Sequence, residues 1–152
     1  MSLEANSEAN VQQAVLFFWV SNMDASVRFY LEGLGFTMKY QWVDEGKLRW
    51  CWLEIGNAAL MLQEYRKPDF EAAQIRGKFG NGVSIYFMCK DALAIYREVS
   101  ARGIQTIEPF VGNHMWVVGV TDPDGYRIDF ESWTDVPEET KFSEWKGEVK
   151  SS

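Results

Sequence analysis

VTDPDGYRIDFES, residues 120–132, joins a tight turn to a strand near the end of a chain of 152 residues. Residues 122–125 have turn chemistry, because Pro fixes φ and Gly adopts backbone conformations closed to most other residues. The segment that follows alternates, so Arg127, Asp129 and Glu131 share one face of the strand. The role of these two acids depends on which side chains the rest of the chain places beside them.

The order of elements that ends in this strand occurs twice. By turn residues and apolar spacing, each of two segments reads as a strand, a helix and three further strands: residues 14–65 and 82–131. The acids at the predicted helix starts, Asp24 and Asp91, are 67 positions apart (91 − 24 = 67). The glycines that end the helices, Gly35 and Gly103, are 68 apart (103 − 35 = 68). This spacing indicates an internal repeat of two βαβββ modules.

The two modules are expected to share one core, because a single βαβββ unit buries little apolar surface. The predicted strands are 14–20, 36–44, 47–55, 58–65, 82–89, 104–111, 113–121 and 126–132. The sequence therefore predicts an α+β domain over residues 13–132. A polar tail (1–12), a linker between the modules (66–81) and a C-terminal extension (133–152) complete the chain.

The charge and composition of the chain argue against several classes of partner. A net charge of −7 disfavours non-specific nucleic-acid binding, which needs Lys and Arg to displace counterions. No apolar run reaches the roughly 18 residues of a membrane span, and the N-terminus lacks the pattern of a signal peptide. Cys51 and Cys89 lie in strand-like runs without a CxxC pattern, as expected for reduced thiols. We expect a cytoplasmic protein that binds neither nucleic acid nor membrane.

Three stretches of the sequence resemble the vicinal oxygen chelate superfamily: VSNMDASVRFYLEGLGF (20–36), LEIGNAALML (53–62) and VTDPDGYRIDFES (120–132). That superfamily contains glyoxalase I, extradiol dioxygenases, and fosfomycin- and bleomycin-resistance proteins. The resemblance covers about residues 13–132. It implies two βαβββ modules that form an eight-stranded, U-shaped incomplete barrel, with the helices outside and the ligand on the concave face. Members often form dimers, so the resemblance also implies a homodimer.

The metal site of the superfamily is the first functional feature that the resemblance implies. Its ligands come from the first and fourth strands of each module and are mostly His, Glu or Gln. The equivalent positions here are Val15, Met61, Ser84 and Asp129. A hard divalent cation needs several oxygen or imidazole donors, and a thioether is too soft. We therefore expect no metal and no other cofactor. The single histidine, His114, is expected to be a surface residue rather than a catalyst.

Alternation along the strands predicts which side chains accompany these positions on the concave face. The predicted ligand-binding residues are Phe17, Trp19, Trp50, Trp52, Met61, Gln63, Ser84, Tyr86, Met88, Trp116, Arg127, Asp129 and Glu131. An aromatic groove with few polar groups is typical of a small-molecule site. The alternative is that these rings fill an ordinary core.

Turn lengths predict three cross-strand neighbours within that groove. A two-residue turn at 56–57 and a four-residue turn at 122–125 set the strand registers. The predicted neighbours are Trp52 with Met61, Trp50 with Gln63, and Trp116 with Glu131. Arg127 has two open roles: it leaves both acids free to meet a ligand cation, or it pairs with one of them as part of the structure.

The leading functional hypothesis is a metal-independent small-molecule binding protein, similar to the bleomycin-resistance proteins that sequester drugs without chemistry. Its ligand is expected to be aromatic or cationic. The alternative is a glyoxalase-like lyase or dioxygenase of the same superfamily. Such an enzyme would use a non-standard metal site, or Asp129 and Glu131 as acid–base carboxylates. A third hypothesis is a protein-interaction module, which a wide aromatic surface outside the groove would favour.

Overall fold

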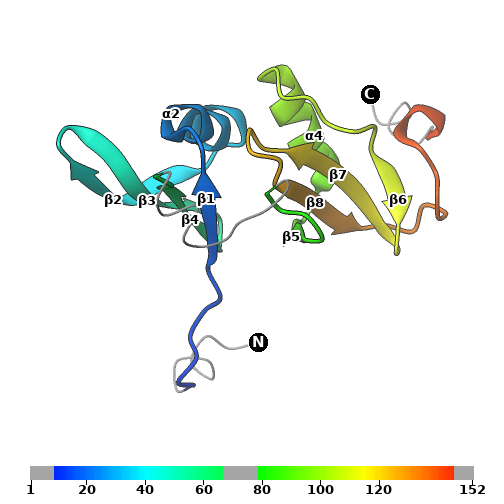
Figure 1. Cartoon of the computed structure of the whole chain (residues 1–152). Coiled ribbons are helices and arrows are strands. Elements are labelled where there is room, and N and C mark those ends of the chain that lie inside the picture. The colour runs from blue at the N-terminus through cyan, green and yellow to red at the C-terminus, as the bar shows by residue number, and fades with distance from the viewer. Residues whose placement is uncertain (1–8, 67–78, 146–152) are drawn as a thin grey trace.

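The computed structural model describes residues 9–66 and 79–145, and its strands form two four-stranded sheets (Figure 1). The first sheet has the order β1-β4-β3-β2 and the second β5-β8-β7-β6. The strands are β1 (Leu16–Val20), β2 (Thr37–Asp44), β3 (Lys47–Ile55), β4 (Ala58–Glu64), β5 (Ser84–Met88), β6 (Phe110–Gly112), β7 (Met115–Thr121) and β8 (Arg127–Trp133). The helical segments are α2 (Met23–Val27), the π-helical η1 (Arg28–Gly33), α4 (Ala92–Ala101) and the 3-10 segment η2 (Phe142–Glu144).

The two modules have the same topology, which confirms the predicted pair of βαβββ units. In each sheet the first strand runs parallel to the fourth, and the third runs antiparallel to the fourth. Both helices begin with an Asx cap. The Asn22 side chain accepts a hydrogen bond from the Ala25 amide, and that of Asp91 accepts one from Ala94, each at 3.0 Å. The sequence predicts that the first helix starts at Asp24, but Asn22 is its N-cap and Asp24 lies in the first turn.

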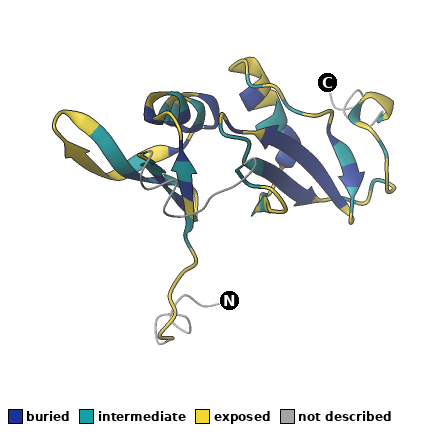
Figure 2. Ribbon diagram, viewed as in Figure 1, coloured by how far each residue is buried: buried dark blue, intermediate teal, exposed yellow. Residues whose placement is uncertain are grey.

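One face of each sheet packs under the helices, and there the apolar core lies (Figures 1 and 2). Alternate residues of the strands are buried on this face, because strand side chains alternate between the two faces. In the first sheet they include Phe18, Val20, Cys51, Leu53, Leu60 and Leu62, and in the second Val118, Ile128 and Phe130. The opposite faces carry no helix.

Contacts between the modules join the two halves of the core. The Tyr30 hydroxyl of the first module donates a buried hydrogen bond to the Asp122 carboxylate of the second, at 2.7 Å. The Tyr126 ring stacks on Phe18 with centroids 4.1 Å apart, and its hydroxyl donates to the Trp19 carbonyl at 2.9 Å. Side-chain packing therefore links the modules. Among the described residues, no strand of one sheet pairs with a strand of the other.

The structure also tests the predicted strand 104–111 and shows where part of the C-terminal extension lies. The predicted strand 104–111 is mostly wrong, because only Phe110–Gly112 form β6. Pro109 lacks the amide that a strand ladder requires. The extension folds back so that Phe142 and Trp145 contact Trp116, with centroid distances of 6.3 and 5.3 Å. Most of the predicted linker lies outside the described residues. In the described part of the chain, no helix is long and apolar enough to span a membrane.

Candidate functional site

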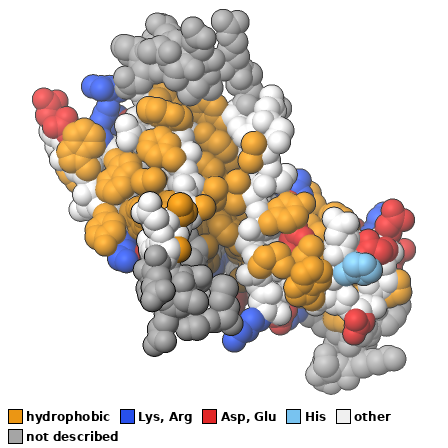
Figure 3. Space-filling model, turned by 90° about the horizontal axis from the view of Figure 1, so that it is seen from below, with side chains coloured by type: hydrophobic (Ala, Val, Ile, Leu, Met, Phe, Trp, Pro, Cys, Tyr) orange, Lys and Arg blue, Asp and Glu red, His pale blue; other side chains and the backbone are white. Residues whose placement is uncertain are grey.

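The helix-free face of the first sheet carries a cluster of aromatic side chains. We call it the open aromatic face; its rings are Phe17, Trp19, Tyr40, Trp42, Trp50 and Trp52. Seen from the side away from the helices, apolar side chains gather over this region (Figure 3). The exposed fractions are 42% for Phe17 and 53% for both Tyr40 and Trp42. These rings are therefore available to a ligand or a partner.

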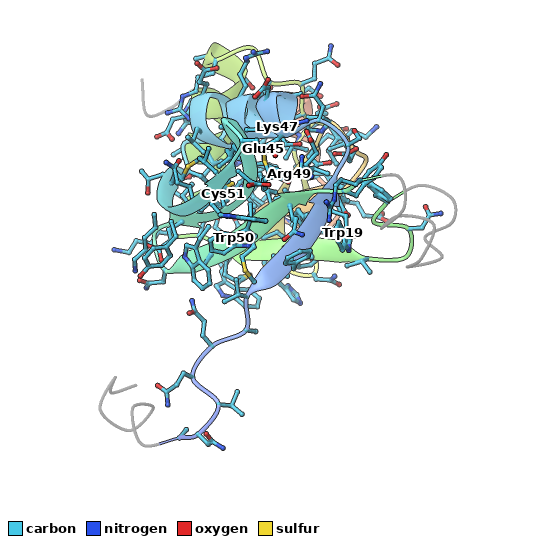
Figure 4. The ribbon with its side chains drawn as sticks, turned by 60° about the vertical axis from the view of Figure 1, so that its left-hand side comes forward. Trp19, Glu45, Lys47, Arg49, Trp50 and Cys51 are labelled. Atoms are coloured by element: carbon cyan, nitrogen blue, oxygen red, sulfur yellow. The ribbon has the colours of Figure 1, made fainter. Side chains whose placement is uncertain are left out.

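Strand register places the predicted residues of this module on that face. Trp52 lies opposite Met61 and Trp50 opposite Gln63, as the two-residue turn predicts. On the other side of β4, Met61 and Gln63 lie beside Phe17 and Trp19. Figure 4 labels Trp19 on β1 and Trp50 on β3. Cys51, which follows Trp50 on β3, is buried on the opposite face, under the helices. All six predicted residues of the first module share one surface.

Ring contacts and one hydrogen bond fix the geometry of the open aromatic face. The Trp52 indole N–H donates to the Glu54 carboxylate at 2.9 Å, and the Lys39 ammonium lies 3.4 Å from the same carboxylate. This hydrogen bond, together with the Lys39 charge, lowers the pKa of Glu54. The Tyr40 ring meets Trp52 edge to face at 6.0 Å. Trp52 is thus held in place before any ligand arrives.

Sequence reasoning missed Tyr40 and Trp42, because a register irregularity decides their face. Glu45 and Gly46 form the two-residue turn between β2 and β3, and next to it Asp44 pairs with Lys47. A regular hairpin would continue this register and put Trp42 opposite Arg49, on the helix side. The register shift between Trp42 and Val43 moves the pairing by one residue, so Trp42 lies opposite Trp50. No turn residue or spacing in the sequence indicates this shift.

The helix-free face of the second sheet carries the polar residues. It contains Ser84, Tyr86 and Met88 of β5, and Arg127, Asp129, Glu131 and Trp133 of β8. Both Nε and Nη2 of Arg127 lie 2.8 Å from Oδ1 of Asp129. Gly119 lies opposite Asp129, and a Cβ there would overlap both partners of this ion pair. Arg127 therefore pairs with Asp129 as part of the structure, which is one of the two roles that the sequence left open.

Glu131 differs from Asp129 in having no such partner. Its cross-strand neighbours are the apolar Met88 and Val117, and only 1% of the residue is exposed. Its Oε2 accepts no hydrogen bond from any described residue. Burial raises the pKa of Glu131, the Asp129 carboxylate raises it further, and Arg127 acts in the opposite direction. This face thus holds one neutralised carboxylate and one acid that burial favours in its protonated form.

The predicted position of Trp116 is wrong. Thr121 pairs with Arg127, so the turn comprises five residues, 122–126, instead of four. The extra residue shifts the register by one and places Trp116 opposite Ser132. A shift of one residue moves a side chain to the other face of the sheet. Trp116 is 4% exposed on the helix side and does not belong to the groove.

The four positions that correspond to the superfamily's metal ligands do not fit a divalent cation. Val15 and Met61 offer no hard donor, Ser84 is a neutral hydroxyl, and the Asp129 carboxylate is occupied by Arg127. Within residues 9–66 and 79–145, no three His, Cys, Asp or Glu side chains come together as a metal site. His114 has 82% of its side chain exposed, and its Nδ1 is 3.9 Å from Glu138. It lines a shallow pocket with Trp133, Thr134 and Asp135.

A cavity of about 460 Å³ lies where the two modules meet, between the β3–β4 hairpin and the edge strand β5. Its lining is mostly apolar and includes Ile55, Ala58, Phe87, Ile95 and Phe130. Of the predicted binding residues, it contains Tyr86 and Met88. The cavity therefore lies at the β5 edge of the second sheet, where Phe87 and Phe130 come from the helix side and Tyr86 and Met88 from the helix-free face.

The sequence and the fold match one family of known proteins. Residues 12–130 match the model of the Glyoxalase/Bleomycin resistance protein/Dioxygenase superfamily. No curated protein sequence matches the chain significantly.

Solved structures share the fold at low sequence identity. TnmS3, an antibiotic binding protein from a Streptomyces species, has a TM-score of 0.63 and 16% identity, covering 84% of this chain and 100% of that one. A glyoxalase/bleomycin resistance protein/dioxygenase from Nocardioides has a TM-score of 0.62 and 18% identity, covering 90% and 94%. The virulence protein STM3117 from Salmonella typhimurium has a TM-score of 0.60 and 22% identity, covering 83% and 99%. At these identities the likeness shows the fold alone.

Proposed function

The chain belongs to the glyoxalase/bleomycin resistance protein/dioxygenase superfamily, and within it we propose a metal-independent protein that binds an aromatic or cationic small molecule. The observation that carries the proposal is the open aromatic face. Six rings lie on one side of the first sheet, and Phe17, Tyr40 and Trp42 expose about half of their surface. Rings that only stabilised a core would lie on the helix side, as Phe18 does.

The chemistry of the neighbouring positions supports binding over metal catalysis. The superfamily's ligand positions hold one strong donor, Asp129, and Arg127 already neutralises it. Aromatic rings bind flat apolar groups and cations through their faces. The antibiotic binding protein TnmS3 has the same fold, which adds support for a small organic ligand.

The proposal includes a homodimer, because apolar side chains are also exposed outside the proposed ligand contacts. Val43 is 50% exposed and Val83 is 55% exposed. Large exposed apolar patches usually mark interaction sites. Sedimentation velocity is expected to give twice the chain mass of 17.5 kDa. A species of single-chain mass at micromolar concentration would contradict this part of the proposal.

The test of binding is the double variant Trp50→Ala/Trp52→Ala. Both side chains are half-buried, so the variant is expected to fold, with a loss below the roughly 3–5 kcal/mol typical of a fully buried Trp. Its affinity for a planar aromatic probe such as 1-methylnaphthalene is expected to fall about tenfold or more, measured by calorimetry. The matched control, Trp50→Phe/Trp52→Phe, keeps the rings and should retain most of the affinity. Equal binding by all three proteins would refute the proposal.

A second candidate function is acid–base catalysis by the two carboxyl groups of β8. Asp129 is ion-paired, whereas Glu131 is buried and its Oε2 has no hydrogen-bond partner among the described residues; such contrasting environments can separate an acid from a base. Elemental analysis of protein purified without chelator distinguishes this function from a metal enzyme. About one divalent metal per chain, lost in Asp129→Ala, would favour a metal-dependent lyase or dioxygenase instead.

A further inference from the structure

We propose that Glu131 links ligand charge to pH: its carboxyl is protonated in the free protein and releases its proton when an aromatic cation binds the second sheet's helix-free face. The inference rests on the proposed function and extends its ligand site from the open aromatic face to the helix-free face of the second sheet. The protein then prefers cations over neutral molecules of the same shape, and this preference increases as the pH rises.

The position of Glu131 supplies the first step. The carboxyl group is flanked by Met88 and Val117 on the neighbouring strands, and only 1% of the residue is exposed. Oε2 has no hydrogen-bond partner among the described residues. An ionised carboxylate without a partner is costly in such surroundings, so burial raises the pKa of Glu131 and favours its neutral form relative to an exposed Glu.

The neighbouring ion pair explains why Glu131 rather than Asp129 responds to a cation. Both guanidinium contacts of Arg127 go to Oδ1 of Asp129 at 2.8 Å, and this pair is neutral as a whole. Gly119 has no side chain, and a Cβ at this position would overlap the Arg127 and Asp129 side chains. A ligand cation at Asp129 would have to displace Arg127, whereas at Glu131 it would replace a proton and move aside the apolar side chains that bury the carboxyl group.

Few other ionisable groups of the described strands face Glu131. Along β8 they are Arg127 and Asp129, and on β5 the only one is Tyr86. The β7 residues on this face, Met115, Val117, Gly119 and Thr121, carry none. His114 precedes β7 and has 82% of its side chain exposed near Glu138. Because it is an exposed imidazole next to a carboxylate, His114 requires its own control.

Exposed side chains around Glu131 provide the contacts for an aromatic cation. Tyr86 is 52% exposed, Met88 53% and Trp133 71%, all on the same face as Glu131. Ring faces attract cations, and a desolvated cation beside a carboxylate compensates its charge. In the bound state the carboxylate pairs with the ligand, and one proton passes to solvent for each cation bound.

The experiment compares two probes of one shape, the permanent cation 1-methylquinolinium and the neutral 1-methylnaphthalene. Affinities are measured between pH 4.5 and 8. The cation's affinity is expected to rise by up to about tenfold per pH unit below the pKa of Glu131 in the folded protein, and then to level off. The ratio of the two affinities should follow the same curve. Calorimetry of the wild type in two buffers of different ionisation enthalpy should give release of up to one proton per cation.

Two variants identify the titrating group. In Glu131→Gln, which keeps the shape and removes the ionisation, the affinity ratio is expected to become independent of pH. In Glu138→Gln, which alters the surroundings of His114, the dependence should remain. A dependence that persists in Glu131→Gln, or a wild type that releases no proton, would overturn the inference.

The outcomes separate this inference from the proposed function. If 1-methylnaphthalene binds through Trp50 and Trp52 but the cation gains nothing with pH, only the role of Glu131 is wrong. If neither probe binds, the proposed function and this inference are both wrong. Proton release by the cation that disappears in Glu131→Gln supports both.

Discussion

Arg127 and Asp129, two residues apart on β8, form an ion pair in which Nε and Nη2 of the guanidinium both lie 2.8 Å from Oδ1 of the carboxylate. The side chain of Asp129 is 4% exposed and that of Arg127 is 36% exposed. Asp129 occupies the position that supplies a metal ligand in the superfamily. Here an internal cation takes that place, so the chain's own residues neutralise the carboxylate.

Asp129→Asn is expected to destabilise the fold by about 1–3 kcal/mol, because a buried charge-assisted contact is lost and Arg127 is left without its partner. It should also lower the pKa of Glu131, since it removes a nearby negative charge and leaves the Arg127 charge uncompensated. Urea unfolding measures the first effect, and the pH midpoint of cation affinity measures the second. Asp91→Asn is the matched control, because Asn also caps a helix. An unchanged midpoint would contradict the coupling of the two acids.

Glu131→Gln is expected to change how stability depends on pH. The pKa of Glu131 is raised in the folded state, so the folded protein binds more protons than the unfolded chain between the unfolded and folded pKa values. This contribution is fully present below the unfolded pKa of Glu, about 4.3, and is lost as the pH rises through the folded value. Urea midpoints from pH 4 to 7 should therefore fall more steeply in the wild type than in the variant. Parallel curves would show that Glu131 has an ordinary pKa.

Tyr30→Phe is expected to cost about 1–3 kcal/mol of unfolding free energy. It removes the hydrogen bond between the modules and leaves the buried Asp122 carboxylate with only the backbone amides of Asp124 and Tyr126. Equilibrium unfolding in urea measures the loss. Tyr40→Phe is the control, because that side chain is half exposed on β2. Similar losses in both variants would mean that the contact between the modules adds little stability.

Trp116→Ala and Trp133→Ala are expected to differ strongly. Trp116 is 4% exposed and packs against Phe142 and Trp145, so truncation should cost about 3–5 kcal/mol. Trp133 is 71% exposed, and its truncation should change thermal stability little. Thermal unfolding monitored by circular dichroism distinguishes them. If Trp133→Ala were the more damaging change, the assigned faces of β7 and β8 would be reversed.

Local patterns in the sequence determined the repeat, the predicted helices and most of the strands. The alternation of side chains depends only on the order of residues along a strand. It therefore correctly places Trp50 and Trp52 on one face of β3 and Cys51 on the other. The turn at Gly56 and Asn57 has two residues, and its length was enough to give the β3–β4 register. Where a turn was regular, the sequence predicted which residues share a face.

Contacts between the modules decided what local patterns could not. Tyr126 reads as the first residue of the last strand, yet its ring stacks on Phe18 and its hydroxyl bonds the Trp19 carbonyl. Its backbone amide also donates to the Asp122 carboxylate. These partners lie in the other module or across the turn, and they keep Tyr126 in the turn rather than in β8. The register of β7 on β8 then shifts by one residue, which sends Trp116 to the core and brings Val117 beside Glu131.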